Sequence, residues 1–129
     1  MNLNQVTLPS LNVPHAISFY EKLGLKLIVH THDKYARFEC PDGESTLSVH
    51  FVDEIHPGSG VIIYFEEKDL DEKVIELQDK GISFQELPKD QTWLWREARL
   101  KDPDGNQIIL FWAGQNRKYP PWRTEFVDS

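Results

Sequence analysis

The chain has 129 residues, of which 40% are hydrophobic and 12% aromatic, as is typical of one globular domain. Its formal net charge of −7 and its lack of a basic run argue against nucleic acid or an anionic membrane surface as a partner. Its one cysteine rules out a framework of intrachain disulfides. The N-terminus is neither basic nor apolar enough for a secretory signal, so we expect a cytoplasmic protein.

The first half of the chain predicts one helix and four strands. Apolar residues recur at helical spacing between Asn12, a suitable N-cap, and Gly24, a suitable helix stop. Alternating apolar residues after Gly24 indicate a strand. The expected strands are 3–8, 25–31, 35–40 and 46–52, and the expected helix is 14–23.

The second half repeats this plan. Asp69 and Gly81 follow Asn12 and Gly24 at the same offset of 57 residues, and a Pro-Asp-Gly turn occurs at both 41–43 and 103–105. The repetition indicates a duplicated βαβββ module, although chance similarity between two common βα units is the alternative. The expected strands are 61–66, 82–87, 93–101 and 107–112, and the expected helix is 70–80.

These elements predict an α+β fold of two tandem βαβββ modules whose curved mixed sheets surround a ligand trough. Module 1 covers about 1–56 and module 2 about 60–114, within a single domain spanning 1–129. A tail over 115–129 carries Pro120 and Pro121 between two aromatic residues. Because neither proline fits a helix or a central strand, we expect an extended, polyproline-like tail.

Four stretches of the chain carry a family resemblance: AISFYEKLGL at 16–25, FEEKDLD at 65–71, WLWRE at 93–97 and DPDGN at 102–106. Together they resemble the vicinal oxygen chelate superfamily, which includes glyoxalase I, extradiol dioxygenases and bleomycin-binding proteins. The resemblance implies the glyoxalase-like fold, a homodimer and a small-molecule ligand. Because the fold hosts several chemistries and some pure binders, the resemblance alone does not define the reaction.

In metal-using members of this superfamily, one Zn, Ni, Mn or Fe ion is held by side chains of the first and last strands of each module. The corresponding positions here are Gln5, Ser48 or His50, Ile62 or Val61, and Ile109. Because Ile62 and Ile109 are hydrocarbon, we expect no resident metal or other cofactor. A displaced metal site formed by Gln5, His50 and Glu97 is the alternative.

The segment 93–101 alternates, which would place Trp93, Trp95, Glu97 and Arg99 on one strand face. If this set faces the trough, it would supply aromatic walls and a polar pair. The alternative is a solvent-facing strand whose tryptophans pack against the other module or a partner chain. Glu97 is the candidate catalytic residue, since a carboxylate between indoles is poorly solvated and suited to accept a proton.

His50 alternates with apolar neighbours and is expected either in the trough or hydrogen-bonded within its own module. At an offset of 62 residues, Tyr35 and Arg37 correspond to Glu97 and Arg99, so both sides of the trough are expected to carry related polar groups. The complete set of expected ligand-binding residues is Gln5, His50, Ile62, Tyr64, Trp93, Trp95, Arg99, Ile109 and Phe111.

The sequence therefore predicts a metal-independent protein that binds a small aromatic or amphipathic molecule, as bleomycin-resistance proteins do. The first alternative is a lyase, isomerase or dioxygenase that uses Glu97 or a displaced metal. The second is a protein-contact module whose aromatic tail binds a partner.

Overall fold

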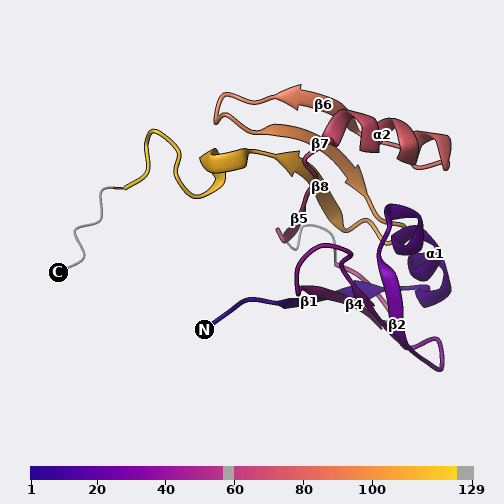
Figure 1. The fold of residues 1–129 in the computed structure, drawn as a ribbon. Helices are drawn as coiled ribbons and strands as arrows, with labels where there is room; N and C mark the ends of the chain where they lie inside the picture. The colour runs from indigo at the N-terminus through magenta and orange to yellow at the C-terminus, as the bar shows by residue number, and fades with distance from the viewer. Residues whose placement is uncertain (57–59, 125–129) are drawn as a thin grey trace. The chain divides into compact units, whose positions relative to one another are not determined.

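The computed structural model describes residues 1–56 and 60–124, which fall into two compact units (Figure 1). Unit 1 comprises Met1–Ile62 together with Lys101–Gln107, and unit 2 comprises Ile63–Leu100 together with Ile108–Ser129. No helix in the described part of the chain is long and apolar enough to cross a bilayer.

Sheet A of unit 1 has the strand order β1-β4-β3-β2. The parallel pair β1–β4 lies beside the antiparallel pairs β4–β3 and β3–β2, so the sheet is mixed. The elements are β1 (Gln5–Ser10), α1 (Val13–Leu23), β2 (Lys26–Thr31), β3 (Tyr35–Glu39) and β4 (Thr46–Phe51).

Helix α1 begins and ends as the sequence predicts. The Asn12 side chain accepts a hydrogen bond from the His15 backbone N–H at 3.1 Å, and Gly24 ends the helix at φ 109°, where a side chain would be strained. The apolar face is buried, and the Tyr20 ring lies 5.6 Å from the Phe38 ring of β3. The core of unit 1 therefore lies between α1 and one face of sheet A.

Sheet B has the order β5-β8-β7-β6, the same as sheet A one module later, as the predicted duplication requires. Helix α2 buries Leu70, Val74 and Leu77, although Asp69 occupies the N-cap position without a side-chain hydrogen bond. The elements are β5 (Ile62–Glu66), α2 (Leu70–Asp79), β6 (Glu86–Asp90), β7 (Arg96–Lys101), β8 (Gln107–Trp112) and the 3₁₀ helix η1 (Gly114–Arg117).

Three strands differ from the prediction by two or more residues, and the first of them, β1, covers 5–10 instead of 3–8. Strand β6 covers 86–90 instead of 82–87, because its charged residues pair with β7: Glu86 lies opposite Arg99, and Asp90 opposite Arg96. A charged segment with Pro88 suits an edge strand.

Strand β7 covers Arg96–Lys101 instead of 93–101. Trp93 belongs to a turn in which Gln91 and Trp95 are hydrogen-bonded and Leu94 adopts φ 67°. The expected alternation therefore breaks at Trp93, which does not share a strand face with Glu97.

The Asp102–Asn106 turn is held within unit 1 by a buried carboxylate. Asp102 Oδ1 accepts the backbone N–H groups of Asp104 and Asn106, each at 2.9 Å. Asp102 Oδ2 accepts the Tyr20 hydroxyl at 2.7 Å and the Asn106 side-chain amide at 2.8 Å. The predicted turn is therefore present, and the hydrogen bond from Tyr20 links it to α1.

The described part of the tail is not extended, unlike the prediction. The Tyr119 N–H donates to the Gln115 carbonyl at 2.7 Å, and the Arg123 N–H donates to the Pro120 carbonyl at 3.0 Å. Pro121 is preset for the second position of this turn, and the Arg123 guanidinium lies 4.1 Å from the Tyr119 ring centre. A local turn therefore replaces the polyproline path.

Candidate functional site

One face of sheet B collects most of the predicted binding residues. Arg96 of β7 bonds Asp71 of α2 with both Nε and a terminal nitrogen, so the even-numbered residues of β7 face the helix. Alternation places the odd-numbered residues on the opposite face, called the open face here because α2 does not cover it, although Glu97, Ile109 and Phe111 on it are buried. The predicted residues that share the open face are Ile62 and Tyr64 of β5, Glu97 and Arg99 of β7, and Ile109 and Phe111 of β8.

Three aromatic side chains, Tyr64, Trp95 and Phe111, form the aromatic cluster on this face. The Trp95 and Phe111 rings stack with centres 4.6 Å apart and planes 19° apart. Tyr64 meets both edge-on, at 5.8 Å from Trp95 and 5.7 Å from Phe111. Tyr64 stays 47% exposed, so the cluster presents an aromatic surface that a ligand can extend.

Glu97 is the most buried charged side chain on this face, with 2% of its surface exposed. The Trp93 indole N–H donates to its Oε2 at 2.8 Å, and an Arg99 terminal nitrogen lies 3.4 Å from its Oε1. Arg99 also pairs with Glu86 at 3.0 Å. Trp93 thus reaches Glu97 from the turn, and Trp93, Glu97 and Arg99 form a connected polar triad.

In unit 1, Gln5 and His50 lie on the same face of sheet A but far apart along it. Gln5 is opposite Thr46, whose hydroxyl donates to the Gln5 side-chain oxygen at 3.0 Å. His50 is opposite Pro9, four residues further along β1, which corresponds to roughly 13 Å. The two side chains therefore do not converge on one point.

The predicted ligand positions Gln5, His50 and Ile109 do not fit a divalent metal. Gln5 and His50 are too far apart to share an ion, and Gln5 already accepts a hydrogen bond from Thr46. Ile109 of β8, one of the ligand positions that the resemblance implies, is hydrocarbon and 2% exposed. Within residues 1–56 and 60–124, no three His, Cys, Asp or Glu side chains form a group that could hold an ion.

Sheet A also carries a hydroxyl network beside Gln5 and His50 that the sequence prediction did not recognise. Thr7 and Ser48 hydroxyls lie 2.8 Å apart, and Arg37 Nε donates to the Tyr35 hydroxyl at 2.9 Å. Partial burial acts to raise the pKa of Tyr35, but hydrogen bonds from Ser48 and Arg37 outweigh it and hold that pKa below its ordinary value. The alternation of polar residues along 5–10 and 46–51 was the available signal.

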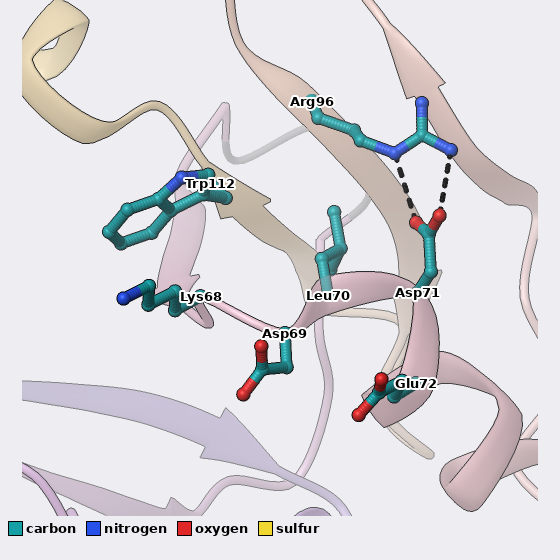
Figure 2. Close-up of a pocket in the computed structure, with 7 residues that line it drawn as sticks. All are labelled: Lys68, Asp69, Leu70, Asp71, Glu72, Arg96 and Trp112. Atoms are coloured by element: carbon teal, nitrogen blue, oxygen red, sulfur yellow. Dashed lines mark hydrogen bonds and ion pairs between the residues drawn. The ribbon is translucent and has the colours of Figure 1, made fainter.

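A cavity of about 230 Å³ opens at the N-terminus of α2, on the helix side of sheet B (Figure 2). Arg96 closes one side by bonding Asp71 Oδ1 at 2.9 Å and Oδ2 at 3.1 Å. None of the predicted binding residues lines this cavity, so it is separate from the aromatic cluster. Its lining residues are Lys68, Asp69, Leu70, Asp71, Glu72, Arg96 and Trp112.

Comparison with known proteins gives one family match and many structural matches. The model of the Glyoxalase/Bleomycin resistance protein/Dioxygenase superfamily matches residues 2–110. No curated protein matches the chain.

Three solved structures illustrate the shared fold. A glyoxalase/bleomycin resistance protein/dioxygenase from Nocardioides has a TM-score of 0.75 and 22% identity, covering 95% of this chain and 89% of that one. A bleomycin-binding protein complexed with bleomycin has a TM-score of 0.69 and 24% identity, covering 86% and 97%. Lactoylglutathione lyase from Agrobacterium tumefaciens has a TM-score of 0.68 and 17% identity, covering 85% and 92%.

Proposed function

Because the chain belongs to the Glyoxalase/Bleomycin resistance protein/Dioxygenase superfamily, we propose that it binds a small planar aromatic molecule on the open face of sheet B. The observation that carries the proposal is the stack of Trp95 on the buried Phe111, with the half-exposed Tyr64 edge-on to both. The bleomycin-binding relative, complexed with bleomycin, supports a small-molecule ligand.

In this proposal the aromatic cluster contacts the ring of the ligand, and Arg99 of the polar triad contacts its polar group. An aromatic contact contributes about 0.5–1.5 kcal/mol beyond its buried area, so stacking on the cluster supplies affinity. The Arg99 guanidinium, held between Glu86 and Glu97, supplies a polar anchor of fixed orientation. A ligand with an aromatic ring and one hydrogen-bond acceptor matches this face.

We propose that this binding needs no metal. The support is the side-chain chemistry: Ile62 and Ile109 stand where metal-using relatives have ligands, and an isoleucine cannot coordinate an ion. Recognition then depends on shape, stacking and one polar anchor.

Fluorescence titration and calorimetry test the proposal, with bleomycin and the neutral planar probe 2-naphthamide as ligands. Tyr64→Ala is the informative variant, because Tyr64 is 47% exposed and its removal disturbs packing least. We expect it to weaken probe binding by roughly 2- to 10-fold. Trp122→Ala, which removes an exposed tail aromatic, is the matched control and should leave binding unchanged. Equal effects of the two variants, or no saturable binding of either ligand, would refute the proposal.

Acid–base catalysis by Glu97 is the second candidate, favoured by its 2% exposure and its fixed hydrogen bonds. A catalytic Glu97 would accelerate exchange of the α-carbon hydrogens of hydroxyacetone in deuterated buffer, measured by NMR. Glu97→Gln should abolish that acceleration. If the chain does not accelerate exchange beyond the buffer rate, the binding function stands alone.

The expected homodimer and its expected cytoplasmic location remain predictions. In the tail, Tyr119 and Trp122 are 63% and 57% exposed. Exposed aromatic side chains such as these suit a contact with a second copy or another protein. Sedimentation equilibrium of the full chain and of a chain truncated after Gly114 tests this, and a tail-mediated dimer would become monomeric on truncation.

A further inference from the structure

Two side-chain hydrogen bonds lie on one face of three neighbouring strands of sheet A. Thr7 of β1 and Ser48 of β4 lie opposite each other, and their hydroxyl oxygens are 2.8 Å apart. Ser48 is fully buried and lies opposite Arg37 of β3. Arg37 Nε donates to the phenol oxygen of Tyr35 at 2.9 Å.

The direction of the Arg37–Tyr35 bond leaves the phenol hydrogen available. Arg37 can only donate, so the Tyr35 oxygen is the acceptor of this bond. The phenol O–H is therefore left to donate to another group.

The Arg37 guanidinium supplies the matching charge. Among the described residues of unit 1, Arg37 makes no ion pair, and its one hydrogen bond uses Nε and leaves both terminal nitrogens for another partner. Glu39, the nearest acid along β3, is paired with Lys26 at 3.8 Å. His50 lies directly opposite Tyr35 and is exposed on the same face. The donors around this point are cationic or neutral.

We propose that Tyr35 and Arg37 bind the carboxylate of a small organic acid on the open face of sheet A. Two terminal guanidinium nitrogens match the two oxygens of a carboxylate, and the Tyr35 O–H adds a third donor. A single guanidinium balances a single negative charge, which favours a carboxylate over a phosphate dianion. This site lies in unit 1 and does not rest on the function proposed for sheet B.

Titration of the full chain with benzoate tests the site, with benzamide as the neutral probe of the same shape and inorganic phosphate as the competing anion. We expect benzoate to bind at least about tenfold more tightly than benzamide or phosphate, since a hydrogen bond to a charged group is worth about a factor of ten or more. Arg37→Gln should remove the preference for benzoate. Tyr35→Phe should weaken the binding of benzoate but not the binding of benzamide. Circular dichroism establishes that each variant is folded.

The tail offers a matched control, because Tyr119 and Arg123 are also a neighbouring tyrosine–arginine pair. Arg123 there donates to the Lys118 carbonyl at 3.1 Å, and within residues 60–124 no side-chain hydrogen bond joins Tyr119 to a serine or threonine. Tyr119→Phe and Arg123→Gln should therefore leave benzoate binding unchanged. Equal binding of benzoate and benzamide, tighter binding of phosphate, or an unchanged affinity in Arg37→Gln would each overturn the proposal. Loss of naphthamide binding in Tyr64→Ala concerns sheet B only, so the two proposals fail separately.

Discussion

The Tyr20 hydroxyl donates a 2.7 Å hydrogen bond to Asp102 Oδ2, although the two residues are 82 positions apart in the chain. Both side chains are buried, with 0% and 5% of their surfaces exposed. Asp102 in turn orders the turn that follows β7 by accepting two backbone N–H groups. The hydrogen bond between Tyr20 and Asp102 therefore links this turn to α1 within unit 1.

Tyr20→Phe should lower the free energy of unfolding by about 1–3 kcal/mol, because it leaves a buried carboxylate without one of its donors. Urea denaturation followed by circular dichroism measures the loss. Tyr119→Phe, on an exposed side chain, is the control and should change stability by less than about 0.5 kcal/mol. A similar small change in Tyr20→Phe would show that the bond contributes little.

Tyr20 should also make the protein less stable in alkali. Burial and the neighbouring Asp102 raise the pKa of Tyr20 above its ordinary value of 10.0. Above pH 10, the Tyr20 phenol loses its proton in the unfolded chain but keeps it in the folded chain. The free energy of unfolding therefore falls by about 1.4 kcal/mol for each further pH unit. Denaturation series between neutral pH and pH 11 should show this loss in the wild type and a smaller one in Tyr20→Phe. Parallel pH profiles for the two proteins would contradict it.

Arg96 joins β7 to both α2 and β6 through Asp71 and Asp90, at 2.9 and 3.0 Å (Figure 2 shows the Asp71 pair). Hydrogen bonding to Arg96 holds the pKa of Asp71 below its ordinary value. Because all three side chains are partly exposed, Arg96→Gln should cost no more than about 1 kcal/mol, and less in high salt. Thermal unfolding at low and high ionic strength measures this loss of stability. A loss that does not depend on salt would mean that Arg96 stabilises the protein by packing and not by charge.

Chelation should leave ligand binding unchanged. If Ile62 and Ile109 have replaced metal ligands, affinity for 2-naphthamide should be the same before and after treatment with EDTA and after addition of Zn²⁺, Ni²⁺, Mn²⁺ or Fe²⁺. Calorimetric titration of the treated and metal-supplemented protein checks this. An affinity that falls with EDTA and returns with one ion would refute metal-independent binding.

Gly43 and Gly105 should behave alike, since they occupy the repeated Pro-Asp-Gly turns at φ 82° and 84°. An added methyl meets nothing within 4 Å at either position, so alanine would cost only backbone strain, about 1–2 kcal/mol. Chemical denaturation of Gly43→Ala and Gly105→Ala compares them. Clearly unequal losses would mean that the two turns are not structural equivalents.

The sequence by itself determined what depends on near neighbours in the chain. Helix α1 lies within one residue of its predicted range because Asn12 and Gly24 act locally, and the duplicated strand orders agree with the predicted repeat. Tyr64 and Phe111, both among the expected ligand-binding residues, contact each other in sheet B. Such features need only backbone preference and side-chain period.

Tertiary structure decided what depends on pairing between distant residues. The charges of β6 determine where it joins β7, a turn brings Trp93 to Glu97, and sheet register separates Gln5 from His50. The bond from Tyr20 to Asp102 belongs to the same class. A local pattern gives the direction of a side chain but not the partner that it meets, because register and turn geometry are set by long-range packing.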